Sequence, residues 1–125
     1  MGKDKQIRFE ILFYESIDGE TPVEDFLDSL DDKMRAKVIG RLEILEEKGN
    51  ALREPLSKSL GDEIFELRVQ QANSKARILY FFYYGAEIIL TNGFIKKTSK
   101  TPKSEIETAK KRREDYLERK KGVGK

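Results

Sequence analysis

The sequence predicts an α+β fold in which helices pack on a mostly antiparallel sheet, in the element order β-α-α-β-β-β-α. Apolar residues recur at helical spacing in two stretches that follow a first strand and end near residue 48. After residue 62 the pattern changes to three β-rich segments joined by connections of a few residues, which is typical of an antiparallel meander. At 125 residues the chain fits one domain, so we expect a single fold over 1–125 with a disordered tail at 120–125.

The first strand and the first helix have clear local patterns. Residues 7–14 carry apolar side chains at every second position, which is the period of a strand with one buried face. Thr21, Pro22 and Glu24 have the spacing of a capping box with proline at the first helical position, which predicts a helix beginning at Thr21. Its apolar stripe consists of Val23, Phe26, Leu27 and Leu30.

A second helix follows at once and completes an N-terminal αα-hairpin. Asp31 or Asp32 can cap its start, and Lys48-Gly49-Asn50 is a typical helix end. Its apolar face consists of Met34, Val38, Leu42 and Leu45. Residues 50–62, interrupted by proline and glycine, are expected to be irregular.

Three predicted strands and a last helix complete the chain. The strands are residues 63–70, 75–84 and 86–97. The middle strand is apolar or aromatic on both faces, as expected of the central strand of the sheet. Thr101 and Pro102 predict the start of a basic helix that runs to about Glu118 and has only a thin apolar seam.

The composition narrows the chemistry that the protein can perform. The chain has no Cys and no His, which excludes disulfides, thiolate nucleophiles, cysteine zinc sites and histidine acid-base catalysis. Catalysis must therefore depend on Lys, Arg, Glu, Asp, Tyr, Ser or Thr. No segment has the pattern of a signal peptide or a membrane span, and we expect a cytoplasmic protein without membrane contact, metal or cofactor.

The charges are distributed unevenly along the chain. Residues 1–95 hold 13 Lys and Arg against 18 Asp and Glu, whereas residues 96–125 hold 12 against 5. The net charges of these two parts are therefore −5 and +7. A basic C-terminal quarter indicates either a side that faces a polyanion or a solvated basic helix.

Strand parity brings three charged residues into one candidate site. Glu66 and Arg68 are two residues apart and share the polar face of their strand. Arg77 interrupts the apolar central strand, where a guanidinium needs a carboxylate partner or an anionic ligand. The spacing leaves two interpretations open, namely a structural ion pair of Glu66 with one of the arginines, or an anion site.

The exit of the last strand adds a cluster of cations and aromatic rings. Lysines and hydroxyl residues follow the strand directly and lead to the start of the last helix, whose free N–H groups also favour anions. The residues that we assign to phosphates there are Lys96, Lys97, Thr98, Lys100 and Lys103. Tyr80 and Phe94 have two interpretations, namely rings that stack on bases or rings of the core, and for the aromatic stretch from Tyr80 to Tyr84 the core is favoured. Together with the arginines, this cluster indicates an RNA-handling surface.

If the protein cleaves RNA, the reaction needs no metal. The 2′-hydroxyl attacks the adjacent phosphorus, and the arginines stabilise the charge that grows on the phosphate oxygens. The base would be Glu66 or a lysine whose pKa is lowered by the neighbouring cations.

Four short motifs in a fixed order resemble the phage-derived HigB branch of the RelE toxin superfamily. They are Glu66-Leu67-Arg68, Arg77-x-x-Tyr80, Gly93-Phe94-x-Lys96-Lys97-Thr98 and Thr101-Pro102-x-x-Glu105-Ile106, within a resemblance that covers about residues 7–118. The resemblance implies the toxin of a type II toxin-antitoxin system, an endoribonuclease (mRNA interferase) that cleaves mRNA on the ribosome. It also implies a HigA-like helix-turn-helix antitoxin, and operator DNA as a ligand of the toxin-antitoxin complex only.

The resemblance also assigns roles to residues. Arg68, Arg77, Lys96 and Lys97 match the positions associated with RNA binding and cleavage. Glu66, Tyr80, Phe94, Thr98, Lys100 and Lys103 complete the expected RNA-binding set, and no metal ligand is expected. A ParE-like gyrase-inhibiting toxin and a non-catalytic RNA-binding module are the alternatives, and the basic C-terminal helix would contact either rRNA or the antitoxin.

Overall fold

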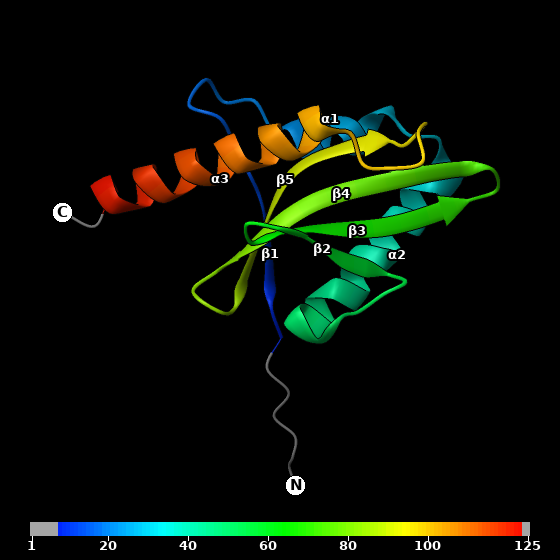
Figure 1. Cartoon of the computed structure of the whole chain (residues 1–125), viewed down its shortest axis with the longest axis horizontal. Coiled ribbons are helices and arrows are strands. Elements are labelled where there is room, and N and C mark those ends of the chain that lie inside the picture. Colours follow the sequence, from blue (N-terminus) through cyan, green and yellow to red (C-terminus); the bar gives the residue numbers. More distant parts are fainter. Residues whose placement is uncertain (1–7, 124–125) are drawn as a thin grey trace, which may run out of the picture.

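The protein has one five-stranded sheet with helices on both of its faces (Figure 1). The structure is a computed structural model and describes residues 8–123. Its elements are β1 (Glu10–Phe13), α1 (Pro22–Ser29), α2 (Asp32–Lys48), a 3₁₀ turn η1 (Gly49–Ala51), β2 (Ser57–Gly61), β3 (Ile64–Gln71), β4 (Ser74–Tyr83), β5 (Glu87–Ile95) and α3 (Lys103–Val123). The predicted α+β class is therefore confirmed.

The sheet has the strand order β1-β5-β4-β3-β2. β1 pairs with β5 in parallel, and all other neighbouring strands are antiparallel. β4 lies at the centre, and its residues Ala76 to Phe81 are all buried, including Arg77. The apolar pattern of this segment therefore correctly predicts the central strand.

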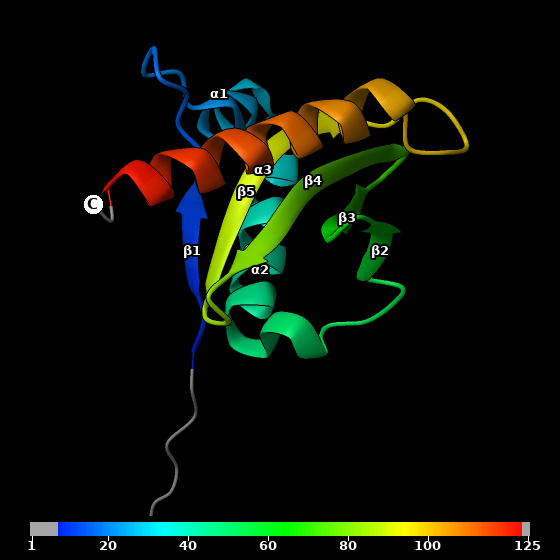
Figure 2. The same cartoon turned by 60° about the vertical axis from the view of Figure 1, so that its left-hand side comes forward.

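The two faces of the sheet have separate cores. Side chains of Leu67, Ile78 and Leu90 pack with the apolar stripes of α1 and α2 on one face. On the other face, Ile64, Leu79 and Phe81 pack with Ala109 and Tyr116 of α3. In Figure 2, α3 crosses in front of β4 and β5 while α2 lies behind them. Side-chain parity along β3, β4 and β5 thus decides which residues share the α3 face.

The predicted helical hairpin is present. Asp31 caps α2 through a 2.8 Å hydrogen bond from the Met34 amide, and all four residues of the predicted apolar face are buried. α1 begins at Pro22, but the Thr21 side chain makes no capping hydrogen bond. Instead the Thr21 carbonyl accepts from the Asp25 amide at 3.0 Å, so the first turn closes through the backbone.

Residues 57–61 form an edge strand where the sequence predicts irregular structure. β2 pairs antiparallel with β3, and its sequence Ser-Lys-Ser-Leu-Gly has neither apolar alternation nor β-branched residues. An edge strand needs hydrogen bonds along one side only, and polar residues are common there. Tertiary pairing with β3 therefore overrides a weak local preference.

α3 is longer than its sequence predicts. It begins at Lys103 and continues past Glu118 to Val123, so residues 120–123 of the predicted disordered tail are helical. Lysines are good helix formers, basic residues favour the last turn of a helix, and Lys121 pairs with Glu118 at 3.6 Å. Residues 124–125 of that tail, and Ile7 of the predicted first strand, lie outside the described residues.

Much of the positive charge of α3 fastens the helix to the body of the protein. Lys110 pairs with Asp62 at 2.8 Å and Arg113 with Glu63 at 2.9 Å. Arg112 donates to the Thr91 carbonyl at 2.9 Å. Polar contacts therefore supplement the thin apolar seam. Within residues 8–123, no helix is both long and apolar enough to cross a membrane.

Gly49 and Gly40 provide a matched test of the packing at the end of α2. Gly49 has φ +54°, and a Cβ there would overlap the ring of Phe9, whereas a Cβ at Gly40 would meet no atom within 4 Å. We predict that Gly49→Ala lowers the free energy of unfolding by about 1–3 kcal/mol. Gly40→Ala should raise it by about 0.5–1 kcal/mol, since alanine is favoured inside a helix. Urea unfolding of both variants would contradict this account if their effects had the same sign.

Candidate nucleic-acid interface

Strand register aligns Arg68, Arg77 and Phe94 on the α3 face of the sheet, and we call these three residues the arginine row. Arg68 of β3 lies opposite Arg77 of β4, and Arg77 lies opposite Phe94 of β5. Residues paired in this way point to the same face of a sheet. The row lies near the end of the sheet where β5 leads into the loop before α3, because Phe94 is the next-to-last residue of β5. Residues separated by up to 26 positions in the chain thus become neighbours.

Glu66 is the buried carboxylate of this row. It is 1% exposed and lies two residues before Arg68 on the same face of β3. Its Oε2 accepts a hydrogen bond from Arg68 Nε at 2.9 Å and lies 3.7 Å from Arg77 Nε. Two like charges placed opposite each other on neighbouring strands repel. Glu66 compensates that repulsion, and both of the ion pairs considered from the sequence are present.

Arg77 has one buried donor without a hydrogen-bond partner among the described residues. Its side chain is 8% exposed, its Nη1 donates to the Ala76 carbonyl at 3.0 Å, and its Nε is buried without a hydrogen-bond partner among the described residues. Burial lowers the pKa of Arg77, Glu66 partly offsets this effect, and Arg68 adds to it. A guanidinium stays protonated at such a site. The arginine pair is therefore held by Glu66.

The loop that connects β5 to α3 brings lysines to the same end of the sheet. Lys96 continues the parity of Phe94, and its amide donates to the Lys75 carbonyl at 2.7 Å. Its Nζ donates to the Ser99 carbonyl at 2.9 Å. Lys97, Lys100 and Lys103 are exposed, as is Thr98, whose hydroxyl donates to the Lys100 carbonyl at 2.6 Å.

The surroundings of Lys96 lower its pKa below that of an ordinary lysine. Burial, followed by the positive charge of Arg77, lowers the pKa of Lys96, and smaller effects come from Lys75 and Arg68. Glu66 opposes this change. The sequence-based expectation of a lysine perturbed by neighbouring cations thus has a specific candidate.

Tyr80 is the predicted site residue that the structure places elsewhere. It is 1% exposed and packs in the core on the face of α1 and α2. Its hydroxyl lies 2.5 Å from that of Ser57, and its ring stacks on Phe65 at 5.6 Å between centroids. Tyr80 therefore cannot stack on a base at the arginine row, so the base-stacking prediction for it is wrong and the core interpretation holds. The parity of β4 is the reason, since positions 77 and 80 point to opposite faces.

Four residues at the site, Lys75, Asn92, Thr101 and Glu105, are not among the site residues predicted from the sequence. Lys75 is exposed beside Lys96, and it has the parity of Arg77, which could have identified it. Thr101 donates a hydrogen bond to Glu66 Oε1. Asn92 Nδ2 donates to Glu105 Oε1 at 2.9 Å and to the Glu105 carbonyl at 3.2 Å, which ties the first turn of α3 to β5. These long-range bonds leave no local pattern in the sequence.

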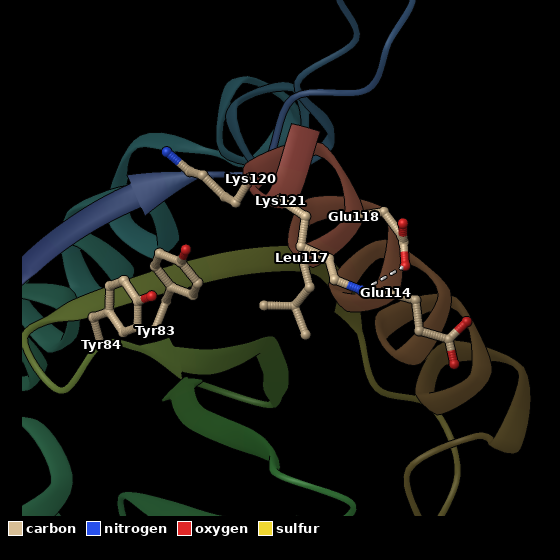
Figure 3. Close-up of a pocket in the computed structure, with 7 residues that line it drawn as sticks. All are labelled: Tyr83, Tyr84, Glu114, Leu117, Glu118, Lys120 and Lys121. Atoms are coloured by element: carbon tan, nitrogen blue, oxygen red, sulfur yellow. Dashed lines mark ion pairs between the residues drawn. The ribbon is translucent and has the colours of Figure 1, made fainter. Parts of the chain in front are cut away.

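A separate hollow of about 850 Å³ lies between the β4–β5 turn and the C-terminal half of α3 (Figure 3). The rings of Tyr83 and Tyr84 lie on one side of it, and Leu117, Glu114 and Glu118 of α3 on the other. None of the predicted site residues lines it. Within the described part of the chain, no group of three or more Asp or Glu is arranged to hold a metal ion.

Comparison with known proteins identifies the family. Residues 25–114 match the family described as "Phage derived protein Gp49-like (DUF891)". The chain belongs to this family. A protein of Mycobacterium tuberculosis (strain CDC 1551 / Oshkosh) named "Probable endoribonuclease HigB1" is 35% identical over 100 residues, which cover 78% of this chain and 75% of that protein. The protein of the same name from strain ATCC 25618 / H37Rv matches to the same extent. Membership of the Gp49-like, HigB-type toxin family is thus confirmed.

Removal of the Glu66 charge should destabilise this Gp49-like protein. We predict that Glu66→Gln lowers the free energy of unfolding by about 2–3 kcal/mol, less than a fully buried pair would lose, because the Arg68 side chain is 27% exposed. Added salt should reduce the deficit, since it screens the repulsion between the arginines. The control Glu107→Gln, at an exposed position, should change stability by less than about 0.5 kcal/mol. Equal stability of the two variants in urea would contradict the assigned role of Glu66.

The pKa of Lys96 should respond to Arg77. The charged form of Lys96 is repelled by the guanidinium, so we predict that Arg77→Gln raises the pH at which Lys96 titrates. The ¹³Cε chemical shift of Lys96, followed by NMR as a function of pH, measures this midpoint in the protein alone. Arg53→Gln, which changes an exposed arginine away from the row, should leave the midpoint in place. An unchanged midpoint in folded Arg77→Gln would remove Arg77 as a cause.

Proposed function

We propose that the protein is the toxin of a type II toxin-antitoxin system and cleaves mRNA as a metal-independent endoribonuclease. The observation that carries this proposal is the pair Arg68 and Arg77, held by a buried Glu66 beside a loop rich in lysine. Membership of the HigB-type family and the name of the M. tuberculosis relatives support the same reaction. Guanidinium N–H groups are donors that a phosphate oxygen would take.

The proposed reaction is an internal transesterification of the RNA. A base removes the proton of the 2′-hydroxyl, and the oxygen attacks the adjacent phosphorus. The bond from phosphorus to the 5′-oxygen of the next nucleotide breaks, that oxygen takes a proton, and the products carry a 2′,3′-cyclic phosphate and a 5′-hydroxyl. Arg68 and Arg77 would stabilise the negative charge that increases on the phosphate oxygens during the attack.

Lys96 is the residue that we assign as base. Its lowered pKa provides a neutral amine more readily than an ordinary lysine does. Glu66, the other base considered from the sequence, already accepts hydrogen bonds from Arg68 and Thr101 and pairs with Arg77. We therefore assign Glu66 to holding the arginines.

The remaining residues would bind the strand on either side of the cleaved bond. The proposed catalytic residues are Arg68, Arg77, Lys96 and Lys97. Lys97 is included because it follows Lys96 in the motif that the chain shares with the toxin family. The exposed Thr98, Lys100, Lys103 and Lys75 would contact flanking phosphates. Phe94, half-buried in the row beside Arg77, offers its ring to a base.

The proposed partners follow from the family. We propose that cleavage occurs in the cytoplasm on mRNA held by the ribosome, and that a HigA-like helix-turn-helix antitoxin neutralises the toxin. Operator DNA would bind only to the complex of the two proteins. The cations of α3 that pair with Asp62 and Glu63 are left out of the proposed RNA surface, because they are already neutralised.

A purified translation system tests the proposed reaction. Wild type should cut mRNA at ribosome-positioned sites, and Arg68→Ala and Arg77→Ala should each reduce the rate about 10²-fold or more. Lys96→Ala should have a comparable effect because it removes the base, and Lys97→Ala a smaller one. The control Lys37→Ala, which changes an exposed lysine of α2, should cut like wild type. Every variant is checked for folding by circular dichroism.

The outcomes separate the candidate functions. Retained cleavage in folded Arg68→Ala and Arg77→Ala would contradict the assigned site. Growth arrest by wild type without RNA cleavage, with or without ribosomes, would favour a gyrase-inhibiting toxin. RNA binding without cleavage or growth arrest would favour a non-catalytic binding module.

A further inference from the structure

The Thr101 side chain joins the loop between β5 and α3 to the arginine row. Its hydroxyl donates a hydrogen bond to Glu66 Oε1, across 35 positions of the chain. We propose that Thr101 is a positioning residue, which sets the orientation of the Glu66 carboxylate and thereby of both arginines. The consequence for RNA cleavage rests on the proposed function, but the geometric claim does not.

The two oxygens of Glu66 have separate partners. Oε2 faces the arginines, at 2.9 Å from Arg68 Nε and 3.7 Å from Arg77 Nε. Oε1 accepts from Thr101, so it is not available to either guanidinium. A carboxylate and a guanidinium prefer to pair through two parallel hydrogen bonds. Thr101 prevents that arrangement by occupying the second oxygen.

Without this hydroxyl, Glu66 would be expected to turn. A buried carboxylate oxygen without a donor is costly, and the nearest available donors belong to the arginines. A bidentate pair of Glu66 with Arg68 would direct two of the guanidinium N–H groups toward the protein. Those N–H groups would no longer face a phosphate, and the charge of Arg68 would be neutralised more completely.

The same hydrogen bond holds the loop of residues 96–102, which lies between two other hydrogen-bonded positions. At its start, the Lys96 amide donates to the Lys75 carbonyl at 2.7 Å. At its end, Asn92 holds Glu105 in the first turn of α3 at 2.9 Å. Between these points, residues 97–100 are exposed, and Thr101 connects the segment to the buried part of the sheet. Thr101 therefore couples the position of the loop to that of the arginine pair.

Three substitutions isolate the hydroxyl of Thr101. Thr101→Val replaces the hydroxyl by a methyl group of similar shape, and Thr101→Ser retains the hydroxyl. Thr21→Val makes the same chemical change at a threonine whose side chain makes no capping hydrogen bond. All three are checked by urea unfolding, so that a loss of stability can be separated from a loss of positioning.

Cleavage kinetics in the translation system provide the first readout. Thr101→Val should reduce kcat by about 10- to 100-fold with little change in KM, because misplaced arginines weaken transition-state stabilisation more than binding. Thr101→Ser and Thr21→Val should remain within about twofold of wild type. If wild type cuts RNA and folded Thr101→Val cuts as fast as Thr21→Val, the positioning role is overturned.

NMR of the arginine Nε–Hε groups provides a second readout that does not depend on cleavage. The Arg68 and Arg77 signals, assigned with Arg→Lys variants, should shift in Thr101→Val and stay in place in Thr101→Ser and Thr21→Val. If wild type proves not to cleave RNA, the proposed function fails, and these signals still decide the geometric claim. Unchanged Arg68 and Arg77 signals in folded Thr101→Val would overturn it.

Discussion

The site depends on one buried carboxylate that holds two positive charges side by side. Arg68 and Arg77 lie opposite each other on neighbouring strands, an arrangement that is unfavourable for like charges. Glu66, 1% exposed, neutralises part of that repulsion through one oxygen and binds Thr101 through the other. The arginines can therefore remain close together and partly buried, while the Nε of Arg77 has no hydrogen-bond partner among the described residues.

The rest of the fold determines where free positive charge remains. α3 carries many of the basic residues of the chain, but Lys110 and Arg113 pair with Asp62 and Glu63 in the turn between β2 and β3, and Arg112 donates to the backbone of β5. The exposed Lys97, Lys100 and Lys103 form no ion pair with any of the residues that the structure describes. Residues 96–125, with a net charge of +7, thus contain two groups of basic residues. One group holds α3 against the sheet, and the other lies beside the arginine row.

Local patterns predict most of the elements and some of the contacts at the site. Alternation, caps and the Lys48-Gly49 end predict the strands and helices, and parity predicts the shared face of Glu66 and Arg68. β2 and the last turn of α3 could not be predicted because pairing with β3 and weak ion pairs stabilise them. The base-stacking role of Tyr80 comes from its aromatic ring and the Arg77-x-x-Tyr80 motif, although its parity differs from that of Arg77. The bonds from Thr101 to Glu66 and from Asn92 to Glu105 join distant segments, which no local pattern reports.

A structure with bound RNA tests the central claim most directly. The experiment is cryo-electron microscopy of the protein on a ribosome that holds an mRNA with 2′-O-methyl groups, which block attack by the 2′-hydroxyl. The account predicts a phosphate within hydrogen-bond distance of both Arg68 and Arg77, with Lys96 near the blocked 2′-oxygen and Glu66 still bound to Thr101. A well-ordered mRNA strand whose phosphates contact α3 or the hollow near Tyr84 instead, with the arginine row empty, would contradict it.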